Sequence, residues 1–125
     1  MHLVPSKTTL LGLVKHVTYV EGVWFDQAIN GGTTEEIGIA DTPDASFDLQ
    51  PSDTIDSVRD AHRRRCERSR RTMAELPFDA EVHGRGDLVV WALHLQALRE
   101  LAQHAGHADI LREQILARQS RPPKR

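Results

Sequence analysis

The sequence predicts an all-α protein, a helical bundle with three long helices. Apolar residues recur every three or four positions in three separate stretches, which is the spacing of a buried helix face. Strong stop signals, an Asn-Gly-Gly sequence and a proline, separate these stretches. With 125 residues the chain can form one modest core. We therefore expect one domain at 1–119 and a disordered basic tail at 120–125, with helices at about 8–30, 52–76 and 87–118.

The first helix, at about 8–30, has clear start and stop signals. Thr8 or Thr9 can cap its N-terminus through a side-chain oxygen. Asn30 or Gly31 can adopt the left-handed conformation that ends a helix. Its predicted buried face consists of Leu10, Leu13, Val14, Val17, Val20 and Trp24.

The stretch from 31 to 50 is acidic, contains glycines and a proline, and shows no helical period. It predicts a long loop, and long loops in compact domains tend to be functional or poorly ordered. We expect Phe47 and Leu49 to attach the far end of this loop to the core.

The second helix, at about 52–76, starts at Ser52 or Asp53 and is rich in arginine. Acidic residues are interleaved with the arginines, and the whole chain has a net charge of −2. This pattern favours a solvated helix face, so we expect no nucleic-acid partner. Cys66 is the single cysteine, and we interpret it as a partly buried small hydrophobe.

Hydropathy gives no sign of a membrane. No apolar run approaches the roughly 18 residues of a membrane span, and the first residues lack the pattern of a secretory signal. We therefore expect a cytoplasmic protein without a membrane partner.

The third helix, at about 87–118, is capped by Asp87 and has apolar residues on two sides. A helix of this kind is typically central in a bundle. One stripe consists of Trp91, Leu95, Leu98, Ala102 and Ala105, and the other of Leu93, Ala97, His104, His107 and Leu111.

The third helix also carries candidate metal ligands. Glu100, His104 and His107 fall on one stripe, because residues three and four apart are neighbours on a helix surface. A catalytic metal needs about three protein ligands, and His16 on the apolar first helix is the natural partner across the bundle. We predict a divalent-metal site formed by His16, His104 and His107, with Glu100 as an alternative third ligand. We assign no partners to His2, His62, His83 and His94.

A different interpretation stays open. A histidine on an apolar helix face is more often a hydrogen-bonded core residue than a ligand. On that interpretation the protein is a non-catalytic structural or dimeric interaction module.

Two segments resemble hallmark segments of the DinB-like superfamily. The first is Thr9-Leu-Leu-Gly-Leu-Val-Lys-His16 with Glu21 and Trp24-Phe25, and the second is His104-Ala-Gly-His107-Ala-Asp-Ile-Leu-Arg-Glu113. The resemblance is strongest to an uncharacterised branch that includes a mini-circle protein. This superfamily includes mycothiol-dependent maleylpyruvate isomerase and the bacillithiol transferases.

The resemblance implies a four-helix bundle that holds a metal, usually zinc or nickel, and acts with a low-molecular-weight thiol. The activity it implies is that of a thiol-dependent transferase or isomerase. In the family one ligand matches His16, and the other two are spaced as His-x3-His or Glu-x3-His. Glu100 and His104 have that spacing, whereas His104 and His107 do not. The third ligand is thus open between Glu100 and His107.

The first bundle helix of the family precedes the segment that matches Leu3-Val-Pro-Ser here. We therefore expect an apolar face to be left uncovered. Three interpretations follow: the start lies upstream, a homodimer covers the face, or the chain is an inactive, truncated family member.

Overall fold

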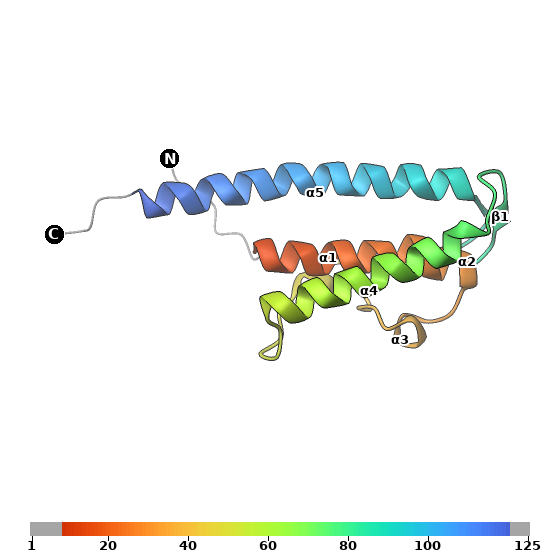
Figure 1. Cartoon of the computed structure of the whole chain (residues 1–125), viewed down its shortest axis with the longest axis horizontal. Coiled ribbons are helices and arrows are strands. Elements are labelled where there is room, and N and C mark those ends of the chain that lie inside the picture. The colour runs from red at the N-terminus through yellow and green to blue at the C-terminus, as the bar shows by residue number, and fades with distance from the viewer. Residues whose placement is uncertain (1–8, 121–125) are drawn as a thin grey trace.

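The computed structural model describes residues 9–120 and confirms an all-α fold built on long helices (Figure 1). Residues 121–125 of the predicted basic tail lie outside the described residues. The long helical segments are α1 (Leu10–Gly22), which continues through the π-helical turn η1 (Val23–Gln27) into α2 (Ala28–Asn30), then α4 (Ile55–Ala74) and α5 (Val90–Gln119).

The first helix begins and ends where the sequence signals stand. The Thr9 side chain accepts a hydrogen bond from the Gly12 backbone N–H at 3.0 Å, and Gly31 ends α2 with φ of 73°. The π-helical turn η1 was not predicted. It contains Asp26, whose side chain is buried at 3% exposure in the middle of an otherwise continuous helix.

The second long helix, α4, begins later than predicted. Its N-cap is Thr54, which forms a capping box with Ser57, rather than Ser52 or Asp53. The carboxylate of Asp53 instead accepts hydrogen bonds from Lys15 Nζ and from the Gln50 backbone N–H, both at 2.7 Å. These bonds lower the pKa of Asp53, the Lys15 bond contributing most. Asp53 therefore attaches the loop to α1 rather than capping α4.

The acidic stretch between the first two long helices contains two short helical turns, α3 (Thr34–Ile37) and the 3-10 turn η2 (Ala45–Phe47). As predicted, Phe47 packs inward, but Leu49 is 41% exposed and does not attach the loop to the core. A Cβ atom on Gly12 would lie 2.7 Å from the Phe47 carbonyl oxygen. The glycine therefore permits the close approach of η2 to α1.

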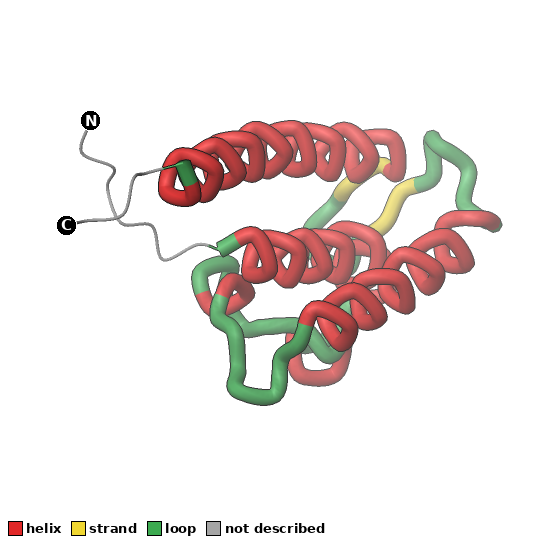
Figure 2. The backbone as a smooth tube through the Cα atoms, turned by 60° about the vertical axis from the view of Figure 1, so that its left-hand side comes forward, coloured by secondary structure: helices red, strands yellow, loops and turns green. Residues whose placement is uncertain are grey.

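A two-stranded hairpin, which the sequence analysis did not predict, joins α4 to α5 (Figure 2). Its strands are β1 (Glu81–Val82) and β2 (Leu88–Val89), paired antiparallel. The prediction that Asp87 caps the last helix is wrong, because α5 follows β2 directly with Val89 at its N-cap. Asp87 instead accepts a hydrogen bond from His83 Nδ1 at 2.8 Å.

The core lies at the hairpin end of the bundle, where Ala28, Val82, Val90 and Leu93 pack together. Helix α1 packs against both α4 and α5, which themselves have few contacts with one another (Figures 1 and 2).

Within residues 9–120, only one of the two apolar stripes of α5 is covered. Leu93, Ala97 and Leu111 are buried, whereas Trp91 and Leu98 are 50% and 64% exposed. The exposed stripe agrees with the expectation of an uncovered apolar face, whereas the central position expected for this helix is not found in this part of the chain. None of the described helices combines the length and the apolarity needed to cross a membrane.

Candidate metal centre

Three of the four candidate ligands meet between α1 and α5. One ligand atom each of His16, Glu100 and His104 lies within 4.8 Å of the other two. His104 Nε2 is 2.9 Å from His16 Nε2 and 3.2 Å from Glu100 Oε2. The two histidines thus approach each other from different helices, and Glu100 stands one turn before His104 on α5.

The His16 ring is buried and packed against the η2 turn. It is only 5% exposed, and the Phe47 ring stacks on it with centroids 4.0 Å apart and planes 10° from parallel. The backbone of η2 can bring Phe47 this close because Gly12 has no side chain. The loop between α3 and α4 therefore forms one wall of the site.

Ser46, which the sequence analysis did not identify, fixes the protonation of His16. The Ser46 hydroxyl donates its single proton to the Pro43 carbonyl oxygen, so its oxygen can only accept from His16 Nδ1, at 2.6 Å. Nδ1 therefore carries the ring proton. His16 Nε2 is left with a free lone pair that faces His104.

Burial also keeps His16 neutral. Desolvation, followed by the neighbouring His104, lowers the pKa of His16 from 6.5 to about 4, and Glu100 opposes the shift. The ring is therefore unprotonated near neutral pH, which is the form that binds metals.

The surroundings of His104 fit a metal ligand. Its Nε2 lies within hydrogen-bond distance of both His16 Nε2 and Glu100 Oε2. A proton on this nitrogen therefore occupies the place where a cation would contact all three ligand atoms. Its Nδ1 is buried and has no hydrogen-bond partner among residues 9–120. The His16 lone pair and the Glu100 carboxylate together hold the His104 proton on Nε2 when no cation is bound, and a cation bound by the three groups would displace that proton. Two imidazoles and one carboxylate are also a ligand set used by catalytic zinc sites.

His107 lies outside this group. It stands one turn further along α5, away from the level at which His16 reaches the helix, and it forms no hydrogen bond or ion pair within the described residues. The structure therefore brings together His16, Glu100 and His104 and leaves His107 apart.

The histidines without assigned partners do have contacts. His62 Nδ1 is 3.0 Å from Thr18 Oγ1, and its Nε2 is 3.3 Å from Cys66 Sγ. His83 bonds Asp87, and His94 packs between two phenylalanines, while His2 lies outside the described residues.

Cys66 is partly buried, as predicted. Its thiol donates to Glu21 Oε1 at 3.4 Å. Burial, with Glu21 second, raises the pKa of Cys66 to about 11. The thiol therefore stays protonated at neutral pH and is unsuited to act as a nucleophile.

An apolar groove of about 400 Å³ opens beside the site. His104 and His62 are its only ring-nitrogen-bearing residues, and nearly all of its remaining wall is aliphatic. The lining residues are Leu10, Leu13, Val14, Val17, His62, Leu101, His104, Ala105 and Ala108. The candidate centre therefore adjoins a space suited to an apolar molecule.

The helical bundle, with two histidines and a glutamate facing one another between α1 and α5, defines a DinB-like protein with a candidate metal centre. A family model described as mycothiol S-transferase matches residues 1–117, and the chain belongs to this family. The sequence resemblance to the DinB-like superfamily is thereby confirmed. Comparisons with curated proteins and with solved structures found no match.

Proposed function

We propose that this protein is a divalent-metal-dependent mycothiol S-transferase whose ion is held by His16, Glu100 and His104. The observation that supports this most is the convergence of three ligand atoms from two helices at the wall of an apolar groove. The family match supports mycothiol as the thiol substrate. Two imidazole nitrogens and a carboxylate oxygen are ligands that suit zinc or nickel.

A bound divalent ion would supply Lewis acidity, lowering the pKa of a thiol so that its sulfur is an effective nucleophile at neutral pH. The chain itself supplies the position and the environment. His16 offers Nε2 because Ser46 holds its proton on Nδ1, and Phe47 fixes the plane of the ring.

The apolar groove is the proposed place for the acceptor substrate. Its aliphatic walls offer an apolar surface beside His104 on which the body of an apolar acceptor can pack. In the transfer, the thiol loses its proton to solvent and its sulfur forms a carbon–sulfur bond, while the acceptor carbon releases its leaving group as an anion with the bonding electrons. We therefore propose an electrophile with an apolar body as the substrate class.

The rival interpretation, a non-catalytic module, is favoured by one contact. The 2.9 Å distance between His16 Nε2 and His104 Nε2 is also that of an ordinary hydrogen bond between two core histidines. On that account the pair stabilises the bundle and has no chemical role.

Thiol consumption separates the two. Protein loaded with zinc or nickel is mixed with mycothiol and an apolar chloronitrobenzene, and thioether formation is followed by absorbance. Transfer is expected for the wild type and for His83→Ala, an exposed control, and is lost in His16→Ala and His104→Ala. Activity that persists in both ligand variants, or that never exceeds the uncatalysed rate with any loaded metal, would refute the proposal.

A further inference from the structure

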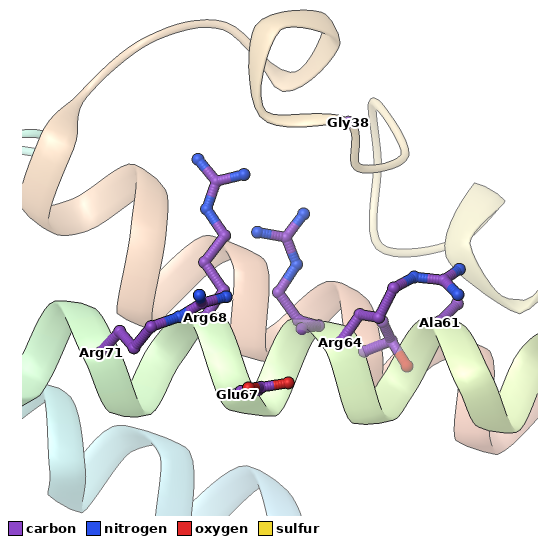
Figure 3. A pocket seen from close by; sticks show the side chains of 8 residues that line it. Gly38, Ala61, Arg64, Glu67, Arg68 and Arg71 are labelled. Atoms are coloured by element: carbon purple, nitrogen blue, oxygen red, sulfur yellow. The ribbon is translucent and has the colours of Figure 1, made fainter.

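A second cavity, on the side of α4 that faces α3 and the loop after it, is lined by arginines (Figure 3). Its volume is about 440 Å³, within the range of small-molecule sites. Its lining residues are Thr18, Gly38, Ala61, Arg64, Arg65, Glu67, Arg68 and Arg71. None of them belongs to the candidate metal centre.

Two of these arginines already have a structural partner. Arg65 Nη1 and Arg68 Nε lie 2.9 and 3.2 Å from the same oxygen of buried Asp26. Arg65 also donates to the Ile37 carbonyl oxygen at 3.0 Å, and Asn30 donates to the other Asp26 oxygen. The Asp26 carboxylate thus forms ion pairs with both guanidinium groups and holds Arg65 and Arg68 in position at the base of the cavity.

The other two arginines have no such partner. Arg64 and Arg71 are exposed and form no hydrogen bond or ion pair within the part of the chain that the structure describes. In Figure 3, Arg68 extends from α4 toward the segment that carries Gly38, and Arg64 and Arg71 lie on either side of it along the helix.

The charge of the cavity is unbalanced. Four guanidinium groups face two carboxylates, Asp26 beneath the floor and Glu67 in the lining, so the excess is two positive charges. Guanidinium groups bind phosphate and carboxylate oxygens through paired hydrogen bonds, and a partly enclosed site strengthens them.

The cavity also continues toward the loop that supports the metal centre. It shares Thr18, Gly38, Ala61 and Arg65 with a neighbouring cavity of about 470 Å³, whose lining includes Lys15 and Ser46. A molecule with an anionic end at the arginines can therefore extend along α1 beneath the loop.

We propose that this arginine cavity binds a small molecule carrying a phosphate or pyrophosphate group, with Arg64 and Arg71 as its principal ligands. Arg65 and Arg68 position the site through Asp26. The ligand is distinct from the thiol and the electrophile of the proposed reaction, and its binding needs no metal.

Calorimetric titration with pyrophosphate, in about 0.15 M salt, tests this proposal. The full-length wild type should bind one pyrophosphate per chain with saturation. Arg64→Gln/Arg71→Gln should weaken binding at least about tenfold, because two charge-assisted contacts are lost. These residues hold no buried group, so the fold is not at risk.

The matched control is Arg59→Gln/Arg63→Gln, which removes the same charge from exposed positions of α4 outside both cavities. It should keep the wild-type affinity. Equal weakening by both pairs, or no saturable binding by the wild type, would overturn the proposal. The proposal would also be overturned if duplex DNA bound more tightly than pyrophosphate and its binding were weakened by both double variants. That result would make this face of α4 a nucleic-acid surface.

Discussion

Replacing Ser46 with alanine should weaken both the fold and the metal site. The hydroxyl is the acceptor for His16 Nδ1–H at 2.6 Å, and both residues are almost fully buried, at 2% and 5% exposure. The Pro43 backbone also forms a hydrogen bond with His16, so the variant loses one buried hydrogen bond rather than all partners of the ring N–H, and the free energy of unfolding should fall by about 1 kcal/mol. The ring could then carry its proton on Nε2, and loss of such support typically lowers metal affinity about 10–100-fold.

Two measurements on the same variant test these effects separately. Urea unfolding in the presence of a chelator gives the stability of the metal-free protein, and competition with a chromophoric chelator gives the zinc affinity. Ser69→Ala is the matched control, because Ser69 is 6% exposed and its hydroxyl has no partner among residues 9–120. Removing that hydroxyl breaks no hydrogen bond, so stability should be unchanged or slightly higher.

The outcome for zinc affinity decides whether the tautomer argument holds. If Ser46→Ala binds zinc as tightly as Ser69→Ala does, Ser46 does not set the protonation of His16. If the two variants also unfold at the same urea concentration, the Ser46–His16 contact has no energetic role and the reasoning fails.

Three further predictions follow from the same site and from α5. His16 has a pKa of about 4 in the folded protein and 6.5 ordinarily, so the unfolded chain binds a proton more readily than the folded one. The free energy of unfolding should therefore rise by roughly 3 kcal/mol between pH 4 and pH 6.5. Urea denaturation of metal-free protein across this range checks it, and a slope unchanged in His16→Gln would contradict it. Gly12→Ala should push the backbone at Phe47 away from α1, lowering stability by about 1–3 kcal/mol in the same assay, with a wild-type midpoint as the contrary result. We also propose that a second copy of the chain covers the exposed stripe of α5 through a two-fold contact. Light scattering should then give twice the 14.1 kDa chain mass for the wild type and the mass of a monomer for Leu98→Glu. A monomeric wild type would exclude this dimer.

The long helices were predictable because each carries an apolar period over many turns. Their details depended on choices that local patterns leave open. Ser52, Asp53 and Thr54 are all good caps. In the structure Asp53 bonds Lys15 and Gln50 instead, and Thr54 forms the capping box with Ser57. The hairpin strands are two residues long each, too short for an alternating pattern to be visible.

The covered face of α5 was also beyond the sequence. Apolarity identifies stripes that can be buried, but the neighbouring helices determine which one is. Leu93 packs in the core, whereas Leu98, equally apolar, is exposed.

The candidate site was predictable in part. Helical spacing and the family resemblance both indicated His16 and His104, which the structure brings together. Glu100 and His107 are each within one turn of His104, so the helix alone cannot choose between them. The third ligand is determined by which turn of α5 His16 contacts, and that depends on how α1 packs against α5.

Ser46 could not have been found from local pattern. It is 30 positions from His16, and its contact depends on the path of a loop that the sequence describes only as aperiodic. The close approach permitted by Gly12 sets that path.

The metal content of protein purified without an affinity tag tests the central claim most directly. We expect about one divalent ion per chain in the wild type and in His107→Ala, and loss of the ion in His16→Ala, His104→Ala and Glu100→Gln. A wild type that holds no metal, and whose thermal stability does not change on adding zinc or nickel, would contradict it.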